Sequence, residues 1–101
     1  LEPKIDRPPR LDGARLQILN GKSAGRELPL VKESVKLGKA GAEIVQINKR
    51  PDGHFIVYLE QSGNKSEPRI NGQHLGSRAV KLHNHDVIEI NRLKIEYYLA
   101  G

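Results

Sequence analysis

The Gly-Lys step at Gly38-Lys39 is the first feature of the sequence that could bind an anion. A glycine followed by a lysine marks many phosphate sites, because the backbone N–H groups and the ammonium both attract negative charge. The nucleotide-binding loop also needs a glycine five residues earlier and a Ser or Thr after the lysine, where this chain has Glu33 and Ala40. The spacing excludes a P-loop nucleoside-triphosphatase and leaves Lys39 as a candidate anion contact.

A second segment, "LHNHDVIEI", places His83, His85 and Asp86 close together. Imidazole and carboxylate groups bind several divalent metal ions, so a metal site is one interpretation. A tight turn is the other, with the Asp86 carboxylate accepting backbone N–H bonds and both histidines exposed. No further ligand cluster is evident in the sequence, so we predict the turn, with no metal and no cofactor.

The sequence shows no catalytic constellation. A serine hydrolase needs a serine on a strained turn beside a positioned base. The serines here lie in polar, turn-like surroundings, and no pair of acids has a spacing typical of a catalytic dyad. We predict that the chain is not an enzyme. The serines in these surroundings are Ser23, Ser34, Ser62, Ser66 and Ser77.

The composition narrows the possible class of protein further. The 101 residues carry a net charge of +5, lack cysteine and methionine, and contain no apolar run near the roughly 20 residues of a membrane helix. We expect a soluble, cytoplasmic domain excised from a larger protein, monomeric when isolated and without membrane contact. The positive charge favours acidic partners, but the cations are spread along the chain, which favours an ordinary solvated basic surface.

Residues 1–13 are rich in proline and charge and predict a flexible tail or linker, followed by one domain at residues 14–101. Turn residues recur at short intervals and no helical period persists, which predicts an all-β domain, a sandwich or small barrel. Asn91-Arg92 and Pro51–Gly53 are predicted hairpin turns. The predicted strands are Arg15–Leu19, Arg26–Leu30, Ser34–Leu37, Ala42–Asn48, His54–Glu60, Arg69–Ile70, Ala79–Leu82, Val87–Ile90 and Leu93–Leu99.

The few aromatic residues bear on nucleic-acid binding, which needs aromatic platforms beside cations. Phe55 alternates with Val57 and Leu59, and Tyr97 alternates with Ile95 and Leu99, so we expect both rings in the core. The histidines that flank strands, His54 and His74, are expected at the surface. A basic β-domain that binds nucleic acid through phosphate contacts is therefore the alternative function.

Four segments taken in order, "GRELPL", "VKLGK", "PRINGQHLG" and "VKLHNHDVIEIN", resemble the forkhead-associated (FHA) family of phosphothreonine-binding domains, over about residues 14–99. The shared features are the glycine-basic steps at Gly25-Arg26 and Gly38-Lys39, the turn at Asn71-Gly72, and a Leu-x-x-x-Asp-x-Ile pattern that begins at Leu82. The resemblance implies an antiparallel β-sandwich of the FHA type (SMAD/FHA-like), with about 10–11 short strands and peptide-reading loops at one end.

The resemblance also implies where a peptide would bind, and there the chain departs from the family. Lys39 stands where the family has an arginine, and the family's Ser-x-x-His segment has no counterpart. His85 replaces a common glycine before the aspartate of the last turn. We expect the remaining contacts to come from the loop residues Lys39, Arg50, Ser62, Asn64, Lys65, Ser66, Arg69 and Asn71.

Two lost hydrogen bonds to a charged group remove about 3–6 kcal/mol, against about 8 kcal/mol for micromolar binding. The resemblance thus indicates a degenerate member in which phosphothreonine recognition is lost or altered. Its expected function is noncatalytic: a protein- or peptide-binding scaffold module within a larger bacterial signalling or regulatory protein.

Overall fold

A computed structural model describes residues 13–38, 43–60 and 67–99. In these ranges the secondary structure consists of β-strands, and no helix is long and apolar enough to cross a membrane. The predicted tail, residues 1–13, lies outside the described residues except for Gly13. The strands are β1 (Ala14–Ile18), β2 (Glu27–Pro29), β3 (Ser34–Gly38), β4 (Ile44–Arg50), β5 (Gly53–Glu60), β6 (Arg69–Ile70), β7 (Gln73–His74), β8 (Val80–Lys81), β9 (Asp86–Ile90) and β10 (Leu93–Leu99).

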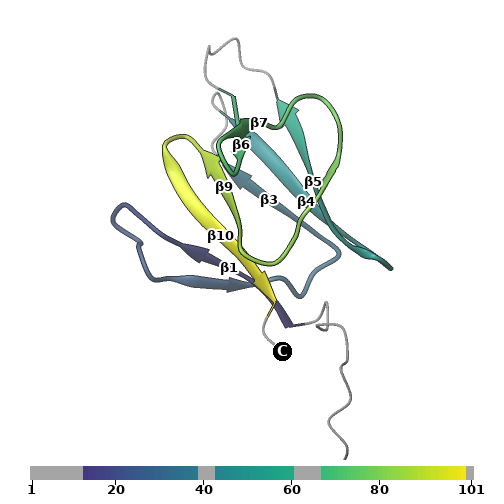
Figure 1. Ribbon diagram of the computed structural model, residues 1–101. Helices are drawn as coiled ribbons and strands as arrows, with labels where there is room; N and C mark the ends of the chain where they lie inside the picture. The colour runs from purple at the N-terminus through teal and green to yellow at the C-terminus, as the bar shows by residue number, and fades with distance from the viewer. Residues whose placement is uncertain (1–12, 39–42, 61–66, 100–101) are drawn as a thin grey trace, which may run out of the picture.

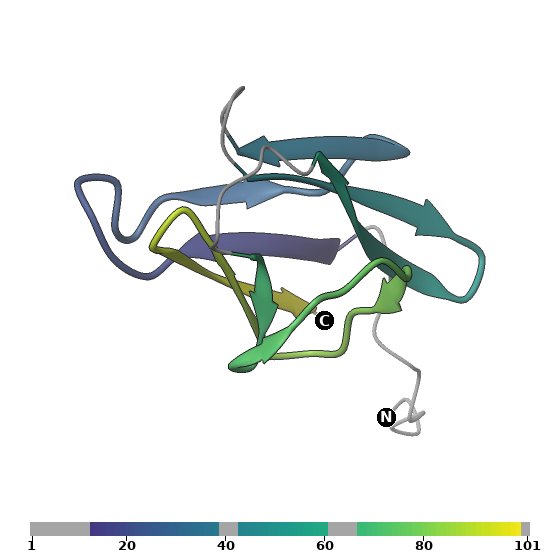
Figure 2. The same ribbon diagram turned by 90° about the horizontal axis from the view of Figure 1, so that it is seen from above.

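The strands form two antiparallel sheets that pack face to face (Figures 1 and 2). One sheet has six strands in the order β2-β1-β10-β9-β6-β7, and the other has four in the order β3-β4-β5-β8. In the six-stranded sheet β1 pairs with β10, which sets Ala14 opposite Leu99. The predicted all-β sandwich is confirmed.

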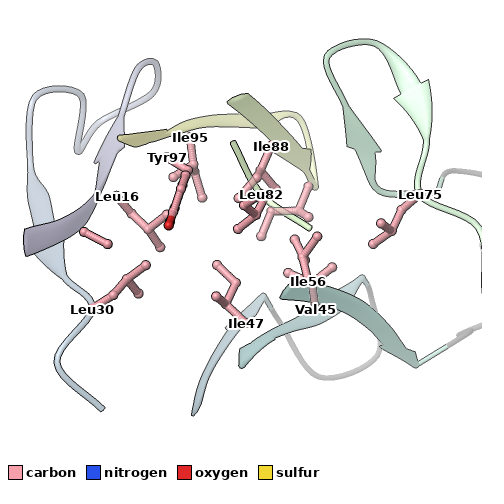
Figure 3. Packing of buried hydrophobic residues seen from close by; sticks show 12 residues of the cluster. Leu16, Leu30, Val45, Ile47, Ile56, Leu75, Leu82, Ile88, Ile95 and Tyr97 are labelled. Carbon is pink, nitrogen blue, oxygen red and sulfur yellow. The ribbon is translucent and has the colours of Figure 1, made fainter. Parts of the chain in front are cut away.

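The core is the apolar layer between the sheets (Figure 3). It forms because alternate residues of each strand point to the same face, so Val45 and Ile47 of β4 meet Leu16 of β1 and Ile95 of β10. Tyr97 belongs to this layer, as predicted, and is 1% exposed. Its phenol ring is the largest of the fully buried side chains.

Both predicted hairpin turns are confirmed. Asn91 and Arg92 have φ angles of 48° and 67° and join β9 to β10 as a two-residue loop. Left-handed conformations at both central positions are typical of the turn that matches strand twist. In the turn between β4 and β5, Gly53 has φ of 149°, a conformation that side chains rarely adopt.

Each predicted strand has a counterpart, and the structure adds one strand. The sequence missed β7, a two-residue strand that pairs with β6 after the Asn71-Gly72 turn. Its residues are polar and exposed, so no apolar alternation marked it. The structure thus has ten strands in its described ranges, within the expected 10–11.

Two side-chain predictions on β5 were wrong. His54, expected at the surface, is 1% exposed, and Phe55, expected in the core, is half-buried on the opposite face beside Lys81 of β8. Because successive residues of a strand face opposite sides, one error entails the other. Ile56 continues the inner face and Val57 the outer face. The β5 segment is apolar on both faces, so alternation did not identify the buried one.

The buried His54 ring makes one hydrogen bond, from or to the Tyr97 hydroxyl, with Nδ1 and Oη 2.8 Å apart. Its Nε2 atom is buried and has no hydrogen-bond partner. Burial, and then the positive charge of Lys49, lowers the pKa of His54 below 6.5. Burial, and then the charge of Asp86, raises the pKa of Tyr97 to about 12, so the phenol stays neutral.

We predict that the domain loses stability as the pH falls below about 6.5. His54 binds a proton in the unfolded state at this pH, whereas its lowered pKa keeps it neutral in the folded state. The loss can reach about 1.4 kcal/mol per pH unit while only the unfolded state titrates. Urea unfolding of wild type and His54→Gln between pH 7.5 and pH 5 measures it. The variant should show a flatter dependence, and identical slopes would contradict this role, since the other histidines are common to both proteins.

Candidate functional site

Several connections meet at one end of the sandwich, which we call the loop end. It is the end where β3 stops at Gly38, β4 starts at Ile44 and β5 stops at Glu60, since these three residues lie in one row of the four-stranded sheet. In the other sheet, β6 starts here at Arg69. The β9–β10 turn also lies here, because it bonds to Glu43 just before β4. This end is at the top of Figure 1.

Reciprocal hydrogen bonds between Glu43 and Asn91 join the two sheets at the loop end. The N–H of Glu43 donates to Oδ1 of Asn91 (3.2 Å), and Nδ2 of Asn91 donates to the Glu43 carbonyl (3.1 Å). The Asn91 N–H donates in turn to Oε2 of Glu43 at 2.5 Å. Glu43 can therefore be buried, at 2% exposure, because a backbone N–H donates to its carboxylate.

Gly38, the glycine of the Gly-Lys step, lies against the same residue. Its φ is 126°, and a Cβ atom there would overlap the carbonyl oxygen of Glu43 and lie 2.9 Å from Cα of Ile44. Only glycine allows this approach of the two chain segments. The glycine that suggested a phosphate loop is thus required by the packing of β3 against the segment before β4.

We call the hydrogen bonds between Glu43 and Asn91 the clamp. A polar cleft of about 500 Å³ opens beside it. Two exposed arginines line it, Arg69 from β6 and Arg92 from the β9–β10 turn, and no ion pair within 4 Å joins either one to an acid in the described part of the chain. The cleft also contains Glu43 and Glu89. Its remaining side chains include an exposed pair, Glu67 Oε2 and His74 Nδ1, 2.9 Å apart. The site thus offers two arginines without an ion pair among the described residues, and it places carboxylates in the same cleft.

The structure brings together only part of the predicted ligand set. Arg69 lies in the loop-end cleft. Arg50 is exposed at the far end of β4, six residues or about 20 Å along the strand from Ile44. The other predicted positions, Lys39, Ser62, Asn64, Lys65 and Ser66, lie outside the described residues.

Asn71 has a structural partner instead of facing the cleft. Its Oδ1 accepts a hydrogen bond from the Val87 N–H (2.8 Å), and its Nδ2 donates to Oδ1 of Asp86 (3.0 Å). The Asn71 N–H donates to the Val87 carbonyl, and the residue has φ of 51°. Both side-chain atoms therefore hold the β6–β7 turn onto β9.

The His83–Asp86 segment forms the predicted turn. Oδ2 of Asp86 accepts the His83 N–H (2.8 Å), and His85 has φ of 74°, the conformation that glycine adopts most easily. The two exposed imidazoles lie near different carboxylates: Nδ1 of His85 is 2.6 Å from Glu96, and Nδ1 of His83 is 3.8 Å from Asp86. Across the described ranges, no three His, Asp or Glu side chains gather as metal ligands would.

Comparison with known proteins adds one firm result. No protein-family model matches the chain, and no curated protein matches it. A solved structure from a structural and functional study of phosphothreonine-dependent FHA domain interactions superposes with a TM-score of 0.66, covering 87% of this chain and 97% of that chain. The chain has the FHA fold. At 17% identity the likeness extends to the fold alone.

Sequence reasoning missed Glu43, Asn91 and Arg92 as parts of the FHA-type loop end. Asn91 and Arg92 were recognised as a turn, but nothing in the sequence paired that turn with a residue 48 positions earlier. Glu43 precedes an apolar strand, and its sequence context is that of an ordinary surface acid. The one signal in the sequence was the acid Glu43 shortly after Gly38. Its role becomes evident only when the pairing of β3 with β4 is known.

We predict that Asn91→Gly lowers the free energy of unfolding by about 1–3 kcal/mol, because it removes both side-chain hydrogen bonds to Glu43. Glycine accepts φ of 48°, so backbone strain does not contribute. Arg92→Gly is the matched control in the same turn and should stay within about 1 kcal/mol of wild type. Urea unfolding measures both, and equal losses would show that the clamp adds nothing.

Proposed function

We propose that this chain is a noncatalytic protein-interaction module that binds a protein or peptide partner at its loop end, with phosphothreonine recognition lost or altered. It would act as a scaffold within a larger bacterial signalling or regulatory protein in the cytoplasm, monomeric as an isolated domain. The observation that carries the proposal is the FHA fold, with two arginines at its loop end that form no ion pair with any described residue.

The composition of the loop-end cleft supports altered recognition. A phosphothreonine carries close to two negative charges and is bound best by convergent cations and backbone donors. Here a dianion beside Arg69 would also face the carboxylates of Glu43 and Glu89, and like charges in one cleft repel. The clamp on Glu43 also uses the Asn91 N–H, which could otherwise bind an anion.

The chain's own sequence supports the same conclusion, because it has no Ser-x-x-His segment between Gly38 and Ile44. Of the predicted ligand set, we keep Lys39, Ser62, Asn64, Lys65, Ser66 and Arg69 as proposed partner contacts and add Arg92. Arg50 is set aside because of its distance along β4, and Asn71 because its side chain holds the turn onto β9.

We predict weak, millimolar binding of a threonine-phosphorylated peptide, measured by two-dimensional NMR against the same peptide without phosphate. Arg69→Ala should reduce the phosphate-dependent shifts, whereas Arg50→Ala, an exposed arginine at the other end of β4, should leave them unchanged. Saturable, phosphate-dependent shifts with a micromolar dissociation constant, about 8 kcal/mol, would refute altered recognition.

One observation favours nucleic-acid binding as a second candidate. Phe55 lies on the outer face of the four-stranded sheet, in a row with Ser34, Asn48 and Lys81. Lys36 stands in the neighbouring row. A partly exposed ring beside lysines can stack on an unpaired base while the ammonium groups meet phosphates.

If this face binds single-stranded nucleic acid, affinity must fall steeply with salt, with a log–log slope of about −0.7 for each neutralised phosphate. Retention of an oligonucleotide at low salt, and equal weakening by Lys36→Glu and Lys81→Glu, would support it. No retention at low salt eliminates this candidate and leaves the protein-interaction module as the sole proposal.

A further inference from the structure

The sandwich has an apolar groove along one side, between the free edges of its two sheets. β2 is an edge strand of the six-stranded sheet and β3 an edge strand of the four-stranded sheet, seen side by side in Figure 2. A cleft of about 590 Å³ lies between them, with Leu16 and Ile18 of β1 and Leu37 of β3 among its lining. A second cleft, of about 410 Å³, continues it, because Leu28 lines both.

Exposed apolar side chains border this groove. Leu28 is 43% exposed and Val31 is 71% exposed, and both line the second cleft. They are two of the four large hydrophobic residues that the described surface exposes. An apolar cleft flanked by exposed leucine and valine is characteristic of a surface that another chain covers.

The edge strands β2 and β3 differ in how readily they can pair with an added strand. Glu33 accepts the Lys49 N–H, so the alternate pairs Val35–Ile47 and Leu37–Val45 are the hydrogen-bonded ones, and the backbone groups of Ser34 and Lys36 point outward from β3. In the described ranges no strand pairs with this side of β3. β2 contains Pro29 at its edge, and proline lacks the N–H that a ladder needs.

Charge along the groove indicates the chemistry of an occupant. The charged residues that line the two clefts, within the described chain, are three cations, Arg26, Lys32 and Lys36, and one acid, Glu27. Glu27 already accepts a hydrogen bond from the Tyr98 hydroxyl. The groove therefore has an apolar floor and a basic rim.

We propose that the groove binds an extended, unphosphorylated peptide in which acidic and aliphatic residues alternate, and that this peptide adds a strand to β3. Its aliphatic side chains enter the clefts, and its acidic side chains lie on the other face beside Lys36, because strand residues alternate in direction. The backbone N–H and C=O groups of Ser34 and Lys36 supply the ladder bonds. This goes beyond the loop-end function, since neither Arg69 nor Arg92 contributes.

The test uses the full chain, isotope-labelled, titrated with the peptide GEVEIEVEG and followed by NMR. Two control peptides are GKVKIKVKG and a peptide of the first composition with its acids in one block. We expect saturable shifts at the amides of Ser34 and Lys36 and at the Leu28 methyls, for the alternating acidic peptide only. The Lys36 amide should also exchange more slowly with solvent when bound.

Matched variants separate the groove from other surfaces. Lys36→Glu and Leu28→Gln should each weaken binding by about tenfold or more. Lys81→Glu, on the opposite edge of the same sheet, and Leu59→Gln, with 46% exposure against 43% for Leu28, should change it by less than about twofold. Equal losses from Lys36→Glu and Lys81→Glu would overturn the proposal.

Other occupants would also overturn it. A concentration-dependent dimer that Leu28→Gln dissociates would assign the groove to a second copy of this chain. Groove resonances that shift when residues 1–12 are deleted would assign it to the chain's own N-terminal segment. Absence of saturable binding, or shifts confined to the loop end, would refute strand addition to β3 while leaving the phosphopeptide result at Arg69 unaffected.

Discussion

The hydrogen bonds between Glu43 and Asn91 are the constraint on which the loop end depends. Apolar contacts have no direction, so the core by itself fixes the relative position of the two sheets less specifically than hydrogen bonds do. Hydrogen bonds are directional, so the Glu43 carbonyl, N–H and carboxylate fix the β9–β10 turn against the start of β4. Every cation in the loop-end cleft takes its position from one of the two sheets that this contact joins.

The same contact links the cleft with the groove. Asn91 lines both, and Gly38, which packs on Glu43, lines the groove. The rest of the six-stranded sheet is fixed by a comparable device, since Asn71 holds the β6–β7 turn onto Val87 and Asp86. Asparagine serves in both places because its amide donates and accepts together and because it tolerates a left-handed backbone. The two surfaces proposed to bind partners therefore rest on one rigid frame.

The sequence predicted the features that are local. Alternation of apolar residues located β10 and its buried Tyr97, and turn chemistry located Asn91-Arg92. It failed where a residue's environment comes from a distant segment. No residue near His54 in the sequence indicated that its ring would be buried and hydrogen-bonded to Tyr97, 43 residues away. The β5 segment is apolar on both faces, so its sequence did not show which face is buried. The loop-end site was predicted in part, since Arg69 lies there, but the role of Glu43 depends on a contact across 48 positions.

The pairing of Ala14 with Leu99 determines how the domain bears mechanical force. The ladder bonds of antiparallel strands run perpendicular to the strands, so tension that separates these two residues breaks the β1–β10 pairs in succession, from Ala14 toward Ile18. Such peeling loads one bond at a time and requires little force. Because the loop end lies at the other end of β10, its geometry persists until the peeling is almost complete.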